Sequence, residues 1–288
     1  MPRPIAIIHQ TGASTSFQDE GRTGMRRFGI APAGSMDPIS AALANDLVGN
    51  SPDATLIEIG PGGVSIELLQ PTWLALVGAG DASPLLPQNS AAELDAGTRL
   101  TIRPTGSGNW SYLAIPSGWE AENVFGSSSR HERSKLGSAI ESGQHLYANS
   151  SPKNRFPNIG RRRPFINKDE HVEPIRILPG PHLSQCATTT FELFLSSEWQ
   201  IPANAYDRTG YRLEGNALPR PKSINSSPMI LGAVQLPPSG QPIVTMNDGP
   251  TVGGYPVFAV IHPEDIATLA QTLPNSPISF RSDESATT

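Results

Sequence analysis

Cysteine and long apolar runs are nearly absent from this 288-residue sequence. Its one cysteine, Cys186, excludes an intrachain disulfide, and nothing in the cysteine usage indicates an oxidising compartment. The most apolar stretch, residues 73–79, is far too short to span a bilayer. The first residues also lack the apolar core of a signal peptide. These absences predict a cytoplasmic protein with no membrane segment.

Positive charge is also scarce. The chain has 21 Lys and Arg against 26 Asp and Glu, a formal net charge of -5. No strong field therefore favours phosphate backbones, and nucleic acid is not an expected partner. The single basic run, residues 161–163, is interpreted as solvated linker. The six histidines show no metal-ligand spacing, so no metal site is predicted.

Turn-forming residues, by contrast, are abundant. The chain has 29 prolines and 27 glycines, which favours short strands joined by turns over a helix bundle. The strands predicted in the first half span residues 55–59, 73–79, 99–103 and 112–115. This pattern is typical of a mainly β fold with a few helices. We expect an amino-terminal β-rich lobe at 1–150, a linker at 151–172 and a carboxy-terminal lobe at 173–288.

One helix is predicted at residues 38–48. Asp37 can accept hydrogen bonds from the free amides of the first turn, and Pro38 suits the first helical position. Gly49 can adopt the left-handed backbone conformation that commonly ends a helix. Three apolar residues four apart predict one buried stripe: Ile39, Leu43 and Leu47.

The second half predicts a hairpin, a helix and two strands. Residues 233–236 and 242–246 flank a Pro/Gly turn and form the hairpin, and a helix follows at 263–273. Strands are expected at 175–178 and 278–281. Periodicity leaves residues 188–196 open between helix and strand.

Two glycine-rich segments could hold a ligand. The first, residues 17–37, leads into the predicted helix, where free amides and the helix dipole favour an anion. In the second, residues 246–256, Asp248, Thr251 and Tyr255 supply an acceptor, a hydroxyl and a stacking surface. The alternative is that both are ordinary Gly/Pro loops whose Asp and Arg residues pair with each other. No phosphate-binding loop and no Gly-x-Ser-x-Gly motif occurs.

These segments, in their order and spacing, resemble the family of biotin-dependent carboxyltransferases, the 5-oxoprolinase C subunit and allophanate hydrolase subunit 2, which includes KipA-like proteins. The resemblance rests on Gln18-Asp19-Glu20-Gly21-Arg22, Pro32-Ala33-Gly34-Ser35-Met36-Asp37, residues 44–50, 56–61, 208–215, 234–237 and 240–243, and Thr251-Val252-Gly253-Gly254-Tyr255-Pro256. It covers about residues 16–280.

The resemblance implies two β-barrel lobes related to the cyclophilin fold. It also implies a partner resembling the B subunit of 5-oxoprolinase, or allophanate hydrolase subunit 1, and in some members a third chain, the A subunit. Some members hydrolyse 5-oxo-L-proline to glutamate with ATP. Others form the carboxyltransferase part of a urea carboxylase, whose biotin would be carried on another chain. Related pairs regulate a sporulation histidine kinase, one as an inhibitor and the other as its antagonist.

The chain departs from the family's pattern in three places. Ser117-Gly118-Trp119 stands where the family commonly has Gly-Gly before an isoleucine, and Pro250 stands where a glutamine is usual. The third departure is a loop. The family usually shows Gly-Ser-Arg-Ser-Thr where this chain has Gly126-Ser127-Ser128-Ser129-Arg130, so Ser128 replaces an arginine. Arg130 is a candidate to reach the same space. The loss of this arginine favours an alternative hypothesis, in which the chain is a non-catalytic regulator instead of an active enzyme subunit.

In the hydrolase interpretation, Arg22, Arg208 or Arg212 holds the substrate carboxylate, because guanidinium binds carboxylate bidentately. Asp19 or Asp248 handles a proton or orients water, and Tyr255 donates to a developing oxyanion. The further substrate-binding candidates are Ser35, Asp37, Tyr211, Gln235, Thr251, Gly253 and Gly254. We expect the loop before the first helix and the turn at 251–255 to line one cavity.

Overall fold

The computed structural model describes residues 3–12, 14–149 and 173–283. The chain forms two compact units: Met1–Arg22 with Ala33–Ile166, and Thr23–Pro32 with Asn167–Thr288. The short segment Thr23–Pro32 therefore belongs to the second unit, although the chain on both sides of it belongs to the first. The linker predicted at 151–172 lies outside the described residues. Within the described chain, no helix has the length and apolar character needed to cross a bilayer.

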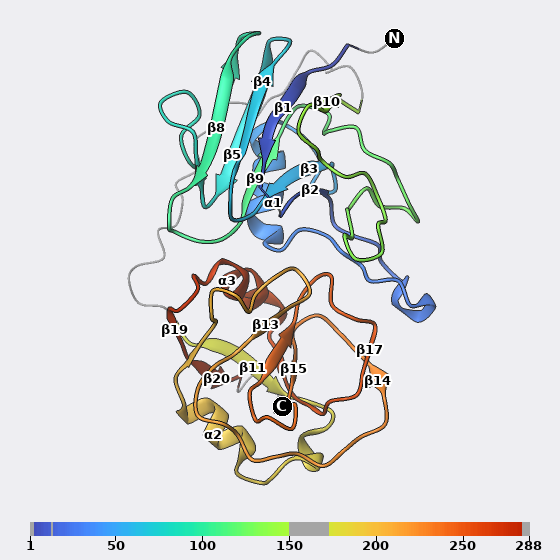
Figure 1. Cartoon of the computed structure of the whole chain (residues 1–288), viewed down its shortest axis with the longest axis vertical. Coiled ribbons are helices and arrows are strands. Elements are labelled where there is room, and N and C mark those ends of the chain that lie inside the picture. Colours follow the sequence, from blue (N-terminus) through green and yellow to red (C-terminus); the bar gives the residue numbers. More distant parts are fainter. Residues whose placement is uncertain (1–2, 13, 150–172, 284–288) are drawn as a thin grey trace. The chain divides into compact units, whose positions relative to one another are not determined.

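The first unit contains two five-stranded antiparallel sheets (Figure 1). One runs in the order β10 (His145–Leu146), β1 (Ala6–Thr11), β4 (Val64–Leu68), β8 (Arg99–Pro104) and β6 (Gly80–Asp81). The other runs β2 (Thr15–Gln18), β3 (Leu56–Ile59), β9 (Ser111–Ala114), β5 (Thr72–Gly78) and β7 (Ser90–Leu94). The four strands predicted from the first half are confirmed as β3, β5, β8 and β9. The mainly β class is likewise confirmed, whereas closure of the sheets into barrels stays a prediction.

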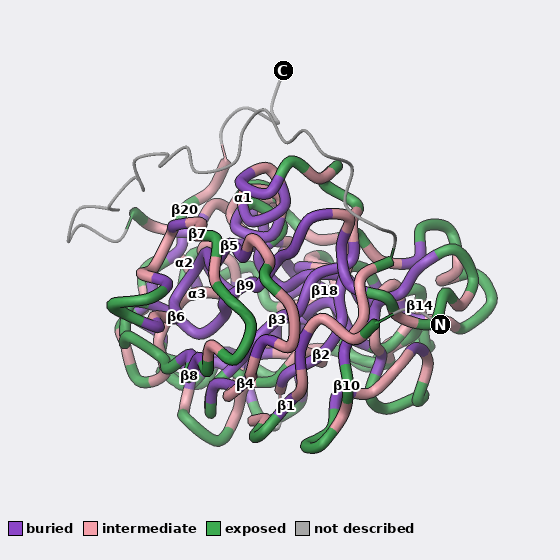
Figure 2. The backbone as a smooth tube through the Cα atoms, turned by 90° about the horizontal axis from the view of Figure 1, so that it is seen from above, coloured by how far each residue is buried: buried purple, intermediate pink, exposed green. Residues whose placement is uncertain are grey.

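The core of the first unit lies between these two sheets. It contains alternate residues of facing strands, such as Ile66 and Leu100 on one sheet and Ile57 and Leu113 on the other. Strands β3 and β9 are buried on both faces, and the tube in Figure 2 is correspondingly purple there. Side chains alternate along a strand, so the cross-strand pair Glu58 and Tyr112 points away from this core. That second face packs against a helix.

This helix, α1 (Pro38–Leu47), begins where the sequence predicted. The Asp37 carboxylate accepts from the amides of Ile39 and Ser40, and Gly49 has a φ of 75° after the last turn. The predicted apolar stripe is wrong at its first member, because Ile39 is 65% exposed. The buried face is made of Ser40, Ala41, Ala44, Asn45 and Leu47. The two polar residues of this face are hydrogen-bonded, Ser40 to the Asp37 carboxylate and Asn45 to loop carbonyls. These bonds allow Ser40 and Asn45 to be buried on the inward face of the helix.

The second unit is built on one six-stranded sheet and two short ladders. The sheet runs β13 (Gly210–Arg212), β16 (Ile243–Thr245), β15 (Ala233–Gln235), β18 (Val257–Ile261), β11 (Ile175–Pro179) and β20 (Phe280–Ser282). The ladders pair β12 (Trp199–Gln200) with β19 (Pro277–Ile278), and β14 (Ser227–Pro228) with β17 (Val252–Gly253). The predicted hairpin is confirmed as antiparallel β15 and β16, and the strand at 175–178 as β11. The strand predicted at 278–281 is divided at Ser279 into β19 and β20, which belong to different sheets.

Helices cover the second unit only in short pieces. The ambiguous segment 188–196 is helix α2 (Thr190–Ser196), and the predicted helix 263–273 is a 3-10 turn, η3 (Pro263–Asp265), followed by α3 (Ile266–Gln271). The remaining 3-10 turns are η1 (Arg26–Phe28) and η2 (Leu183–Gln185). Residue Phe194 of α2 is fully buried, with its ring 4.5 Å from that of Phe280 and 5.1 Å from that of Phe258. These aromatic contacts pack α2 against the sheet.

Candidate functional site

In the first unit, the predicted site residue Asp19 is surrounded by hydrogen-bond donors from a distant loop. Its Oδ1 accepts from the Ser127 and Ser129 hydroxyls, each at 2.6 Å. Its Oδ2 accepts from the Ser128 amide at 2.7 Å and from the Ser128 hydroxyl at 3.0 Å. The Gly21 amide adds a fifth donor at 2.8 Å. We call Asp19, Arg22, Ser127, Ser128 and Ser129 the serine–aspartate cluster.

These contacts set the ionisation of Asp19. Burial alone would raise the pKa of its carboxyl, but hydrogen bonds from Ser127, Ser129, Gly21 and Ser128 outweigh burial and lower the pKa below its ordinary value of 3.8. A carboxylate held in its charged form by five donors is a weak proton acceptor. The geometry therefore favours a positioning role for Asp19.

The predicted site residue Arg22 supports the other side of the same loop. Its side chain is buried, and its guanidinium donates to the carbonyls of Val124 at 2.9 Å and Ser129 at 2.5 Å. Asp19 binds the hydroxyls and one amide of the serine loop while Arg22 binds its carbonyls. Together they fix the loop to the end of β2.

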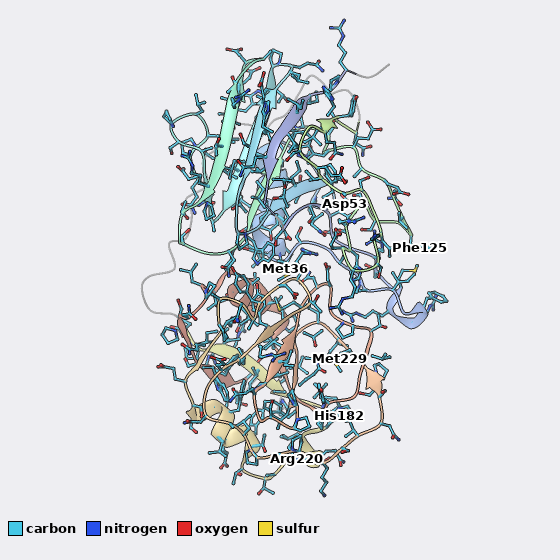
Figure 3. All side chains as sticks on the ribbon, in the orientation of Figure 1. Met36, Asp53, Phe125, His182, Arg220 and Met229 are labelled. Carbon is cyan, nitrogen blue, oxygen red and sulfur yellow. The ribbon has the colours of Figure 1, made fainter. Side chains whose placement is uncertain are left out.

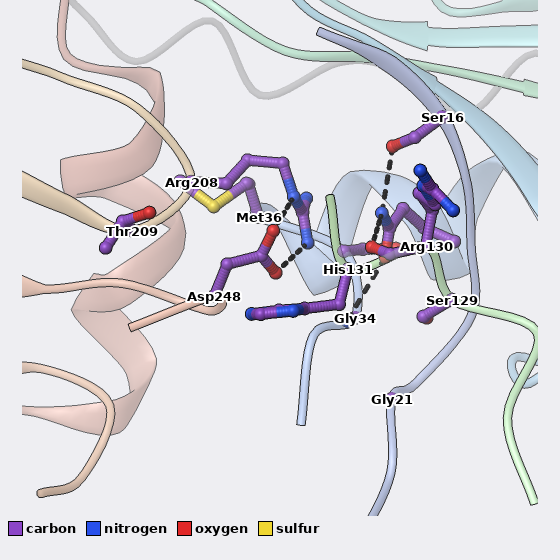
Figure 4. A network of polar contacts seen from close by, with 12 residues as sticks. Ser16, Gly21, Gly34, Met36, Ser129, Arg130, His131, Arg208, Thr209 and Asp248 are labelled. Atoms are coloured by element: carbon purple, nitrogen blue, oxygen red, sulfur yellow. Dashed lines mark hydrogen bonds and ion pairs between the residues drawn. The ribbon is translucent and has the colours of Figure 1, made fainter. Parts of the chain in front are cut away.

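Gln18 extends this arrangement to the loop before α1 (Figure 4). Its Nε2 donates to the Ser16 hydroxyl and the Arg130 carbonyl, and its Oε1 accepts from the Gly34 amide at 3.1 Å. The Ser35 amide donates to the Asp19 carbonyl at 3.1 Å. At Gly34, φ is 90° and a Cβ would lie 3.1 Å from a backbone oxygen, so this close approach requires glycine.

The amides at the start of α1 are already bonded within the protein. Besides the Asp37 cap, the Met36 amide donates to Glu58 at 2.7 Å and the Asp37 amide to the Tyr112 hydroxyl at 2.6 Å. Tyr112 in turn donates to Glu58 at 2.9 Å. The anion predicted at this helix start is thus replaced by the protein's own carboxylates, and Asp37 acts as a cap.

Tyr112 is held as a neutral phenol. Full burial, together with the nearby negative charges of Glu58 and Asp37, raises its pKa well above 10. It therefore keeps its proton for the hydrogen bond to Glu58.

The loop that departs from the family's pattern is well satisfied. The Ser128 hydroxyl contacts both Asp19 and the Thr55 hydroxyl, the latter at 2.6 Å. The guanidinium of Arg130 is bonded to Glu132 at 2.8 Å and to the Gly137 carbonyl at 2.7 Å. The Arg130 guanidinium is thus bonded to Glu132 and Gly137, while Ser128 donates to the Asp19 carboxylate through its amide and its hydroxyl.

In the second unit, Arg208 and Asp248 form a bidentate ion pair. Arg208 Nε lies 3.0 Å from Asp248 Oδ2, and Nη2 lies 2.9 Å from Oδ1 (Figure 4). Their side chains are 11% and 7% exposed, and the Asp248 amide also donates to the Arg208 carbonyl at 2.8 Å. Asp248 of segment 246–256 therefore pairs with an arginine, but that arginine lies outside the segment, 40 residues earlier in the chain.

The two residues that follow on β13 face opposite ways. Tyr211 is fully buried, with its hydroxyl 3.1 Å from the Ala270 carbonyl and its ring edge-on to Tyr206. The phenol of Tyr211 is thus a bonded core group, and the substrate-binding role expected for it stays a prediction. Arg212 is exposed.

The remaining predicted site residues lie around β14 and β17. Gln235, nearly buried, donates to Thr245 at 2.9 Å, and its Oε1 would lie 3.1 Å from a Cβ on Gly253. The Thr251 carbonyl accepts from the Met229 amide, Gly254 is open to solvent, and Tyr255 is 43% exposed. The shared cavity predicted for these residues and the loop before α1 stays a prediction.

A cavity of about 640 Å³ in the second unit contains none of these residues. Its walls include Glu198, Trp199, Glu214 and Gln241. Among the residues that the structure describes, no group of His, Cys, Asp and Glu is arranged to hold a metal ion.

The sequence interpretation missed several residues of the network. Glu58 stands within an otherwise apolar, fully buried strand, and a charge in such a strand is a signal that could have been used. The serine run at 127–129 was noted only as a departure from the family's pattern, and its bonds to Asp19, more than 100 residues away, were not predicted.

Comparison with known proteins decides the family. A model described as "Carboxyltransferase domain, subdomain A and B" matches residues 28–282. The chain belongs to the carboxyltransferase domain family. This carboxyltransferase-domain chain is 34% identical to the 5-oxoprolinase C subunit of Escherichia coli over 284 residues, which are 95% of this chain and 89% of that protein.

Other relatives are longer than this carboxyltransferase-domain chain. It is 30% identical to urea amidolyase of Saccharomyces cerevisiae, covering 96% of this chain but 16% of the yeast protein. The solved structure of TTHA0988 superposes with a TM-score of 0.87 at 32% identity, covering 98% of this chain and 57% of that one. The chain thus spans little more than half the length of that structure.

Proposed function

We propose that this chain is the C subunit of an ATP-dependent 5-oxoprolinase, which hydrolyses 5-oxo-L-proline to L-glutamate together with a partner that resembles the B subunit. The single observation that supports this best is the match to the E. coli protein, which extends over 95% of this chain and 89% of that protein. A relation over nearly the whole of both chains favours the same role, because neither chain contributes a large region that the other lacks.

The contacts of the predicted site suit a chain that completes its site with another polypeptide. The carboxylates of Asp19, Asp37 and Asp248 are all engaged by donors of their own unit. In this proposal they position loops, and the exposed Arg212 and Tyr255 meet the substrate. Arg212 would hold the substrate carboxylate, and Tyr255 would donate to the oxyanion of the opening amide. Arg208 would reach the substrate only as part of its pair with Asp248.

Nucleotide binding is assigned to a partner chain. The amides at the start of α1 are bonded to Asp37, Glu58 and Tyr112, so this helix offers no site for phosphate. ATP would then be used by the complex rather than held by a motif of this chain.

The test is ATP-dependent glutamate release by this chain purified with its cognate A and B subunits. Tyr255→Phe removes one hydroxyl and should lower kcat by about 100-fold with little change in KM. Arg212→Ala should chiefly raise KM, whereas Arg220→Ala, an exposed arginine of the same unit with no assigned role, should change neither. A complete complex that releases no glutamate would refute the function; unaltered turnover in Tyr255→Phe and Arg212→Ala would refute the assignments.

A second candidate is carboxyl transfer from carboxybiotin to a urea-like amide. The family description and the likeness to yeast urea amidolyase favour it. The biotin would be carried by a lysine on another chain. Transfer of the carboxyl group from free carboxybiotin to urea, which leaves biotin and carboxyurea, without ATP-dependent glutamate release, would select this candidate.

A further inference from the structure

Large apolar side chains gather on one part of the second unit. Five large hydrophobic residues are exposed among the described residues of this unit, and four of them lie on three neighbouring segments: Phe28 (63% exposed), Ile230 (51%), Val252 (60%) and Tyr255 (43%). We call these four residues the apolar face. Single exposed hydrophobic residues are ordinary, whereas a group of them marks an interaction surface.

Hydrogen bonds hold the three segments side by side. Arg26 of η1 donates to the Met229 carbonyl at 3.0 Å, and the Met229 amide donates to the Thr251 carbonyl at 2.9 Å. Ladder β14–β17 then pairs Pro228 with Val252. Figure 1 shows β14 and β17 together at one edge of the unit, and Figure 3 labels Met229 beside them.

The face is formed before any partner arrives. Met229 is buried beneath it, and a Cβ on Gly253 would lie 2.2 Å from the Met229 methyl, so the two segments are closely packed. Because these backbones are already fixed, docking would order little more than side chains, which lowers its entropic cost.

We infer that the apolar face is where the second polypeptide of the complex docks; this inference rests on the proposed function. Two observations favour a different chain as the occupant. The E. coli relative is named as one subunit of an enzyme, and in TTHA0988 this fold occupies 57% of a longer chain, so further polypeptide accompanies it there. A partner on this face would also lie beside Tyr255, the proposed oxyanion donor.

The rim of the face indicates the partner's chemistry. The exposed Arg27 holds its guanidinium 4.8 Å from the centre of the Phe28 ring. An apolar surface with a carboxylate at its edge would bury the Phe28 ring and pair with Arg27. The partner is therefore an apolar protein surface with an acidic residue at its rim.

The experiment measures binding of the cognate B-type partner by titration calorimetry. Phe28→Ser and Val252→Ser should each weaken binding at least tenfold, as for residues central to an interface. Leu193→Ser is the matched control: Leu193 is 42% exposed on α2, at the other side of the unit in Figure 1, and its change should leave the Kd within twofold. Arg27→Glu should slow association and change its salt dependence.

Two results would overturn the inference. One is wild-type affinity in Phe28→Ser and Val252→Ser with an unchanged thermal transition. The other is self-association of the wild type, seen by ultracentrifugation and abolished by Phe28→Ser, which would assign the face to a second copy. Glutamate release tests the two proposals separately. If the complex forms through this face but releases no glutamate, the proposed 5-oxoprolinase function is refuted. If the variants bind the partner and release glutamate as the wild type does, the apolar face is not the docking surface.

Discussion

The serine–aspartate cluster of the first unit and the Arg208–Asp248 pair of the second use the same charged residue types. Asp19 and Arg22 lie on one loop, whereas Arg208 and Asp248 come from two segments 40 residues apart. In the first, Asp19 accepts from hydroxyls and amides, and Arg22 donates to carbonyls of the same distant loop. In the second, the aspartate and arginine bond each other at two points. Neutral donors leave the Asp19 charge in place, whereas Asp248 is neutralised by a guanidinium, so similar composition produces different electrostatics.

The largest effect should come from breaking the ion pair. Arg208→Ala leaves Asp248, 7% exposed, without its guanidinium, and should lower the free energy of unfolding by about 3–5 kcal/mol. Urea denaturation measures it. The matched double variant, Arg208→Met with Asp248→Leu, should cost less than Arg208→Ala alone, because no charge is left buried. A loss below about 1 kcal/mol in Arg208→Ala would mean that the pair is solvated.

Removing Asp19 should have the next largest effect. In Asp19→Ala the hydroxyls of Ser127 and Ser129 lose a charged acceptor, and the free energy of unfolding should fall by about 3 kcal/mol. Asp19→Asn keeps the size and should cost less. Exchange of the Ser128 amide, which bonds to Asp19 at 2.7 Å, should quicken in both variants. An unchanged exchange rate would show that Arg22 alone holds the loop.

Acid should weaken the cluster without any substitution. The folded pKa of Asp19 lies below its ordinary value of 3.8, so its contribution is full above about pH 4 and is lost as the pH falls through the folded pKa. Protonation removes the charge but keeps the side chain, so the loss should be smaller than in Asp19→Ala. Urea denaturation at pH values between about 3 and 6 measures it, and Asp19→Asn should show a flatter pH dependence. Identical profiles would contradict the lowered pKa.

The elements that could be predicted from the sequence are those with local signals. Asp37, Pro38 and Gly49 fix α1 through contacts within a few residues, and the apolar runs fix β3, β5 and β9. The strand at 278–281 was wrong because division into β19 and β20 depends on partners far along the chain: Trp199 pairs with Ile278, and Ile175 with Phe280.

The site was predictable as a set of segments but not as a set of contacts. The motifs selected Asp19, Arg22 and Ser35, which do share one network, and Arg208 with Asp248, which do pair. The serines at 127–129 were noted only as a departure from the family's pattern. Their bonds to Asp19 were not predicted, since a hydroxyl that binds a carboxylate has no sequence period. The motifs did not distinguish the buried Tyr211 from its exposed neighbour Arg212, because alternation along β13 sends the two side chains to opposite faces.

The smallest effect should come from Ile39, the exposed member of the predicted stripe on α1. Ile39→Ser removes an apolar side chain that is already 65% exposed, so the free energy of unfolding should change by less than about 0.5 kcal/mol. Leu47→Ala on the same helix is the control; Leu47 is 2% exposed, and its truncation should cost about 2–5 kcal/mol. Both are read from urea denaturation. The contrast between Ile39→Ser and Leu47→Ala tests what decides which face of α1 is buried. Comparable losses would mean that Ile39 is covered, as the spacing alone predicts, whereas unequal losses mean that the Asp37 cap and the inward Ser40 set the helix face.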